Sequence, residues 1–228
     1  MHQLHYLLMG IRRVQGSRLT KPQRLPISLH HLSALHTFLA NRFIPHDARM
    51  LWAACTAAFF GLLRSSEYTS PSSDTQLPST LLRSHLTFAA DYSHATLHLP
   101  FSKTDQFGRG ASVQLFTLQS YLCPVSALAH YIAARRQTSG PLFIFCDGTF
   151  LTRNDIYNIL REAFPTQANI NTHSFRIGGA TALSIAGVPE YVIQILGRWS
   201  SDSFLRYIRI PNQTLRGFQN RMVVPESR

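Results

Sequence analysis

Residues 173–209 read HSFRIGGATALSIAGVPEYVIQILGRWSSDSFLRYIR, and the interpretation of the whole chain starts from this stretch. If its first part is a helix, His173 and Arg176 lie three positions apart and share one face. A histidine exchanges a proton near neutral pH, and the guanidinium of an arginine can hold a phosphate through two parallel hydrogen bonds. Helices are predicted over roughly 173–186, 189–196 and 201–209.

The composition predicts a folded protein that binds a polyanion. The 228 residues carry a formal net charge of +11, yet only 14% of them are charged, against about 25% in ordinary domains. Among the 22 basic residues, Lys21 and Lys103 are the only lysines, so arginine dominates. A hydrophobic content of 45% excludes a disordered polycation, and no apolar run reaches the roughly 18 residues of a membrane span. Nucleic acid is the leading candidate partner.

The cysteines and histidines do not predict a metal site or a disulfide framework. Cys55, Cys123 and Cys146 are odd in number and far apart, which excludes zinc-knuckle spacing and favours buried, reduced side chains in an intracellular protein. His94 and His98 could share one face of a strand, but no carboxylate or cysteine stands at ligand spacing beside them. No glycine-rich nucleotide loop and no signal peptide is present either, so no cofactor is expected.

The pattern along the chain predicts an α+β fold, mostly helical with one small antiparallel β-sheet. Residues 28–210 are expected to form one domain, preceded by a short helix and a basic linker (1–27) and followed by a tail (211–228) with a helix near 213–221. The predicted helices are 3–13, 29–42 capped by Ser28, Ala48–Leu63 capped by Asp47, Pro124–Arg136, and one to Phe164 capped by Thr152. The predicted strands are Leu86–Ala89, Thr96–Phe101 and Ser112–Leu118, with a possible fourth at Leu142–Phe145, and a hairpin turn around 103–110.

Four further residues could carry chemistry, and each also has an ordinary structural explanation. Arg64 follows an apolar helix, where the helix dipole favours a cation. Lys103 lies in the hairpin turn and is either solvated or a general acid, a role that a flexible amine can fill. Trp199 is typical of a core and Tyr207 of an interface. No single residue among them is decisive.

The ordered set is more specific than its members. Its sequence motifs are FFGLLRSSE at the first arginine, SKTDQFGRG at the lysine, HSFRIGGAT at the histidine–arginine pair and LGRWSSDSFLRYIR at the tyrosine. This series resembles the catalytic signature of the tyrosine recombinases (the phage-integrase family) over roughly residues 47–210. The sequence of the last motif is similar to that of recombinases of eukaryotic mobile elements, such as DIRS-like retrotransposons and Cryptons. Two departures are that Trp199 stands where many members have histidine, and that Trp199 to Tyr207 is one residue shorter than in many phage and bacterial members.

The resemblance implies cleavage and rejoining of DNA strands. The hydroxyl of Tyr207 attacks a phosphodiester and forms a 3′-phosphotyrosyl link with a free 5′-hydroxyl, and rejoining reverses the step without ATP. Arg64 and Arg176 would neutralise the non-bridging oxygens of the transition state in place of a metal ion. The implied partner is double-stranded DNA, bound by a homotetramer in the nucleus, with the tail either exchanged between protomers or folded back.

The remaining roles are implied in the same way. Lys103 would protonate the departing 5′-oxygen, and His173 would act as general acid or base and as a phosphate ligand. Trp199 would donate one hydrogen bond and pack under the phosphate, and Glu67 would orient Arg64. Residues 1–13 would be the remnant of an N-terminal DNA clamp. Two alternatives stay open: a non-catalytic DNA-binding remnant of a mobile-element recombinase, and a type IB topoisomerase that shares the chemistry.

Overall fold

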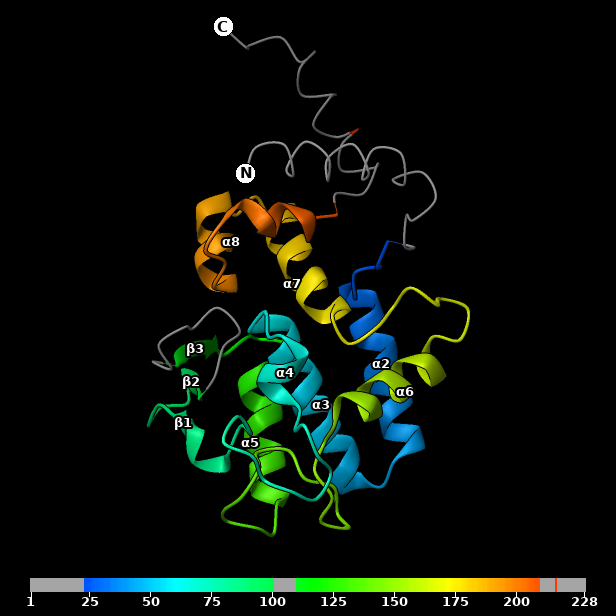
Figure 1. Ribbon diagram of the computed structural model, residues 1–228, viewed down its shortest axis with the longest axis vertical. Helices are drawn as coiled ribbons and strands as arrows, with labels where there is room; N and C mark the ends of the chain where they lie inside the picture. The colour runs from blue at the N-terminus through cyan, green and yellow to red at the C-terminus, as the bar shows by residue number, and fades with distance from the viewer. Residues whose placement is uncertain (1–22, 101–109, 210–215, 217–228) are drawn as a thin grey trace, which may run out of the picture.

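The computed structural model describes residues 23–100, 110–209 and 216 (Figure 1). Within them the fold is mostly helical with a small three-stranded sheet, as predicted. The α-helices are α2 (Leu29–Arg42), α3 (Pro45–Phe60), α4 (Ser65–Tyr68), α5 (Pro124–Ala134), α6 (Arg153–Ala163), α7 (Ser174–Ile185) and α8 (Glu190–Gly197). The strands are β1 (Leu86–Phe88), β2 (His94–Leu99) and β3 (Ala111–Phe116), and the 3₁₀-helices are η1 (Arg83–His85) and η2 (Asp202–Arg206).

Helix α3 forms the centre of the fold. Every residue from Met50 to Phe59 is buried, as expected for a helix that is apolar on most sides, and α2, α5 and α7 all pack against it. The predicted cap at Asp47 is wrong, because the helix begins at Pro45, where a fixed φ and a missing N–H suit the first turn. The Asp47 carboxylate instead accepts a hydrogen bond from the backbone N–H of Cys146 at 2.8 Å.

The caps of two other helices are confirmed. The Ser28 hydroxyl accepts from the backbone N–H of His31 at the start of α2, and the Thr152 hydroxyl accepts from Asp155 at the start of α6. Each cap supplies a partner for one of the orphan N–H groups of the first turn. These local signals place both helices where the sequence predicts them.

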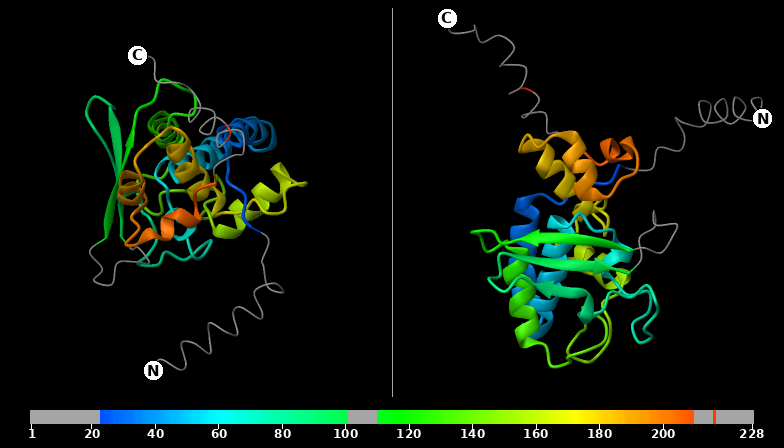
Figure 2. Two further views of the ribbon diagram at one scale, coloured as in Figure 1. Left: turned by 90° about the horizontal axis from the view of Figure 1, so that it is seen from above. Right: turned by 90° about the vertical axis from the view of Figure 1, so that its left-hand side faces the viewer.

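The sheet has the order β1-β2-β3 with both pairs antiparallel. Leu97 of β2 pairs with Leu86 on one side and with Val113 on the other. The sheet lies beside the helical body, and its strand β3 packs against α5 (Figure 2). The fourth strand predicted at Leu142–Phe145 is wrong: the segment makes isolated bridges at Pro141 and Ile144. Its backbone is held partly by the hydroxyl of the buried Tyr131, which donates to Leu142 O and accepts from Ile144 N–H.

Two glycines allow α7 to lie directly on neighbouring backbone. A Cβ atom on Gly178 would come within 1.9 Å of the carbonyl oxygen of Ile27, and one on Gly179 within 2.4 Å of that of Phe59. Glycine has no Cβ atom, so it permits this close approach of two backbones. The contact with α7 packs Ile27, which is fully buried, against the domain. The end of the predicted linker is therefore part of the folded body.

Several predictions fall outside the described residues. These are the helix at 3–13, the hairpin turn with Lys103, and the tail helix at 213–221. Cys55 and Cys123 are buried as predicted, but the prediction for Cys146 is wrong, because it lies in a turn whose residues 146–149 are all exposed. Among the described residues no helix is long and apolar enough to cross a membrane.

Candidate active site

The segment after α3 places Arg64 beside Glu67. Helix α3 ends at Phe60, Leu62 takes a left-handed conformation (φ 47°), and the short helix α4 follows. Glu67 Oε1 accepts from Arg64 Nη1 at 2.7 Å, and Oε2 accepts from the Arg64 backbone N–H at 2.8 Å. The contact that the resemblance implies between these two residues is therefore present. Glu67 itself is buried, with 1% of its side chain exposed.

Arg176 is buried at the base of the same site. Its side chain is fully buried, and its guanidinium donates from Nη1 to Leu62 O and from Nη2 to Gly197 O at 2.5 Å. The Nε–H has no partner within the described residues, so it is a buried donor whose hydrogen-bonding capacity is unused. Burial and the nearby charge of Arg64 lower the pKa of Arg176 to about 9, so the guanidinium stays charged at neutral pH.

Trp199 covers the guanidinium of Arg176. The centre of its ring lies 4.1 Å from Arg176 Cζ, a cation–π contact with the face of the indole. Gly197 makes this arrangement possible, because a Cβ atom there would lie 1.6 Å from the Trp199 ring. The glycine of the LGRW motif thus supplies both room for the indole and the carbonyl that Arg176 binds.

Tyr207 lies directly beside these groups. Its ring centre is 5.0 Å from that of His173 and 5.2 Å from that of Trp199, and Arg176 Cζ is 5.9 Å from it. The predicted helix over 201–209 is a shorter 3₁₀-helix, η2, and Tyr207 follows its last residue. Thr181 of α7 fastens the segment, since its hydroxyl donates to Tyr207 O at 3.2 Å.

His173 stands in a strongly positive surrounding. Burial and the charges of Arg24, Arg176, Arg64 and Arg153 lower the pKa of His173 to about 4. The imidazole is therefore neutral at pH 7, and it can accept a proton from a neighbour. A negatively charged ligand placed among the same arginines would offset their charge and raise this pKa.

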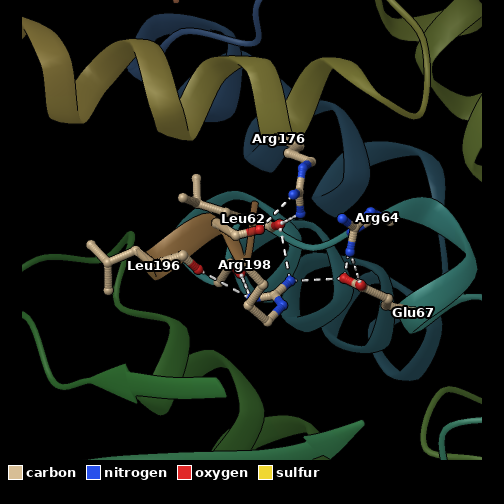
Figure 3. A network of polar contacts seen from close by, with 8 residues as sticks. Leu62, Arg64, Glu67, Arg176, Leu196 and Arg198 are labelled. Carbon is tan, nitrogen blue, oxygen red and sulfur yellow. Dashed lines mark hydrogen bonds and ion pairs between the residues drawn. The ribbon is translucent and has the colours of Figure 1, made fainter. Parts of the chain in front are cut away.

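Arg198 belongs to the site, and the sequence did not single it out. Its Nη2 donates to Glu67 Oε2 at 2.8 Å and to Leu62 O at 3.2 Å, and its Nη1 donates to Gly61 O at 3.1 Å (Figure 3). Arg198 ends α8 in a left-handed conformation with φ 56°. A non-glycine residue at such a position is uncommon, and no sequence signal marks it, because the glycine typical of a helix end stands one position earlier, at Gly197.

The structure thus brings together most of the predicted residues. Lys103 lies outside the described residues. The groups that meet are Arg64, Glu67, His173, Arg176, Trp199 and Tyr207, joined by Arg198. No cluster of metal-ligating side chains occurs in the part of the chain that the structure describes. Chemically, the site offers several guanidinium groups for an anion, a neutral imidazole and a phenol.

Solved structures with this arrangement of elements are recombinases and integrases. XerH site-specific recombinase bound to its difH substrate, in a pre-cleavage complex, matches with a TM-score of 0.60 and 14% identity over 90% of this chain. XerA recombinase matches with a TM-score of 0.59 and 15% identity over 91% of this chain and 68% of its own. The chain has the catalytic fold of the tyrosine recombinases. The Tn1549 transposon integrase in complex with a circular intermediate DNA shares this fold, with a TM-score of 0.59 and 14% identity over 89% of this chain and 67% of its own.

The tyrosine-recombinase fold accounts for part of those proteins. The chain spans 56% of the length of XerH. No protein-family model matches the sequence, and no curated protein is significantly similar to it. The likeness therefore rests on the arrangement of helices and strands, and the motif wording adds to it independently.

Proposed function

We propose that this chain cleaves and rejoins DNA strands through a 3′-phosphotyrosyl intermediate on Tyr207, without a metal ion or ATP. The observation that carries the proposal is the position of the Tyr207 ring, which lies against His173 and Trp199 with the buried Arg176 beneath them. Residues from α7 and from the end of α8 meet there with the α3–α4 junction. A phenol can act as the nucleophile in covalent catalysis, and the arginines beside it can bind the phosphate that it attacks.

The proposed reaction assigns a task to each group. Tyr207 Oη forms a bond to phosphorus, its proton passes to the neutral imidazole of His173, and the bond from phosphorus to the 5′-oxygen breaks. By resemblance, Lys103 gives that oxygen its proton. Arg64 and Arg176 stabilise the charge on the non-bridging oxygens, and removing either is expected to slow cleavage on the order of a hundredfold or more. Rejoining reverses these bond changes with a new 5′-hydroxyl.

Two features of the surface support DNA as the substrate. The net charge of +11 favours a polyanion, and a hollow beside His173 is basic. It is lined by Arg24, Arg153, Asn154, Tyr157, Asn171 and Thr172. Both arginines of this hollow act electrostatically on His173, so phosphates next to the cleaved one would lie within reach of positive charge.

The assembly and the origin of the protein are part of the same proposal. By the likeness to the recombinase fold, we propose a homotetramer on DNA, with the tail at 211–228 exchanged between protomers. Origin in a eukaryotic mobile element and location in the nucleus rest on the wording LGRWSSDSFLRYIR.

A covalent trap tests the proposal. The full chain is incubated with a library of nicked duplexes of randomised sequence, from which the short cleaved strand diffuses away and leaves the adduct stranded. We expect an SDS-stable adduct whose peptide mass places the nucleotide on Tyr207, and none with Tyr207→Phe. An adduct that survives in Tyr207→Phe, or salt-sensitive binding without any adduct, would overturn catalysis by Tyr207; the latter result supports the non-catalytic DNA-binding alternative. Relaxation of supercoiled plasmid without strand exchange would instead identify a topoisomerase.

A further inference from the structure

Arg198 connects two parts of the chain that are distant in sequence. It ends α8, directly before Trp199, and the segment that it begins leads through η2 to Tyr207. Its guanidinium reaches the end of α3 and the start of α4, where it binds Gly61 O, Leu62 O and Glu67. Helix α8 packs mainly on α7, so this side chain is a direct link from the tyrosine-bearing segment to the arginine-bearing junction (Figure 3).

Glu67 divides its two oxygens between the two arginines. Oε1 accepts from Arg64 Nη1 at 2.7 Å, whereas Oε2 accepts from Arg198 Nη2 at 2.8 Å. The exposed fractions of the Arg64 and Arg198 side chains are 16% and 14%, and that of Glu67 is 1%. Because a buried carboxylate is costly without partners, the position of each arginine depends on the other through this shared acid.

A second shared acceptor joins Arg198 to the base of the site. Leu62 O accepts from Nη1 of Arg176 and from Nη2 of Arg198. Leu62 itself is left-handed, and this conformation presents its carbonyl to both guanidinium groups. The left-handed backbone is unfavourable for a residue other than glycine, and these side-chain contacts give a reason for arginine at that position.

We propose that Arg198 is a positioning residue, which ties the Trp199–Tyr207 segment to Glu67 and so fixes the placement of Tyr207 relative to Arg64 and Arg176. This inference rests on the proposed function. Arg198 acts through Glu67 and Leu62 O, and it is not assigned a contact with the DNA. Loss of the tie leaves the charged groups near one another but moves the nucleophile, and a displacement of about 1 Å can cost a hundredfold in rate.

The main variant is Arg198→Gly, because glycine accepts the left-handed backbone and removes the side chain alone. Arg198→Lys keeps the charge but cannot make the forked contacts. The matched control is Arg42→Gln, which breaks an exposed ion pair with Glu162 whose side chains are 57% and 48% exposed. Each variant of the full chain is compared by single-turnover cleavage of the nicked substrate recovered from the library, by affinity for that substrate, and by melting temperature.

We expect Arg198→Gly to cleave on the order of a hundredfold more slowly, with DNA affinity changed less than about threefold, while Arg42→Gln behaves as the wild type. Arg198→Lys should stay impaired, and millimolar guanidinium ion should restore part of the rate to Arg198→Gly. Cleavage at the wild-type rate would overturn the inference. An affinity loss that matches the rate loss would also overturn it, because Arg198 would then bind the phosphate directly.

A readout without DNA separates this inference from the proposed function. In a Trp52→Phe background Trp199 is the remaining tryptophan, and its ring is 8% exposed. Arg198→Gly should increase the quenching of its fluorescence by acrylamide. Without the contacts of Arg198, the Trp199 ring is no longer held against Arg176 and becomes more accessible to the quencher. Unchanged quenching would overturn the positioning role even if the wild type forms an adduct, and increased quenching would support it even if no adduct forms.

Discussion

The low pKa of His173 predicts a specific loss of stability in mild acid. Its folded pKa is about 4 and its ordinary value is 6.5, so between these two values the unfolded chain binds a proton that the folded chain does not. The contribution of the neutral His173 to the free energy of unfolding is fully present above pH 6.5 and is lost as the pH falls toward 4. At pH 5 the two pKa values correspond to about 2 kcal/mol of unfolding free energy lost relative to pH 8.

The assay is urea unfolding of the wild type and of His173→Gln at pH 8 and at pH 5. Glutamine does not titrate, so the variant should lose about 2 kcal/mol less than the wild type over this interval. Tyr207→Phe is the matched control: it keeps His173 and an aromatic ring beside it, and it should show the pH dependence of the wild type. Titration of the imidazole by NMR measures the folded pKa directly. A midpoint near 6.5, or equal pH dependence in the wild type and His173→Gln, would refute the electrostatic reasoning about this site.

Four further variants test the basic hollow and the packing of α7. Arg24→Gln and Arg153→Gln should each weaken DNA binding and reduce the salt dependence of log K by about 1 if each arginine contacts one phosphate; an unchanged salt slope, measured by fluorescence anisotropy, would remove the hollow from the DNA interface. Gly178→Ala should cost about 3 kcal/mol in urea unfolding, because its Cβ would overlap Ile27 O. Gly187→Ala, where φ is +77° and the space is open, should cost about 1 kcal/mol, and equal losses in the two variants would contradict the close approach of α7.

Most elements of the fold could be predicted because their signals are local. Ser28 and Thr152 cap the helices that follow them, and apolar alternation marks the paired strands. Asp47 misled the prediction, since a good capping residue near a helix start is usually a cap. Its carboxylate instead binds the backbone of Cys146, 99 residues away, and no local pattern reports such a contact.

The site likewise contains residues that could be predicted from the sequence and one that could not. The resemblance of its motifs to the tyrosine-recombinase signature implied which residues meet, and the structure brings the arginines, the histidine, the tryptophan and the tyrosine together. Arg198 was not predicted, because a helix-ending arginine normally points to solvent. Its partner, Glu67, is 131 residues earlier in the chain, and the contact becomes visible once α8 and the α3–α4 junction are placed side by side.

The charge distribution agrees with the proposed binding of a phosphodiester. Glu67 forms ion pairs with both Arg64 and Arg198. Arg176 instead contacts two carbonyl oxygens and the face of an indole ring. Three buried or half-buried guanidinium groups thus carry more positive charge than this acid offsets. Burial is the main cause of the lowered pKa values of Arg176, Arg198 and His173, and the charges of neighbouring arginines lower them further. A bound phosphate supplies the missing negative charge, and in the pentacoordinate transition state it supplies more of it. Under the proposed function, the repulsion among the cations would therefore be relieved most in that state, as catalysis by electrostatic preorganisation requires.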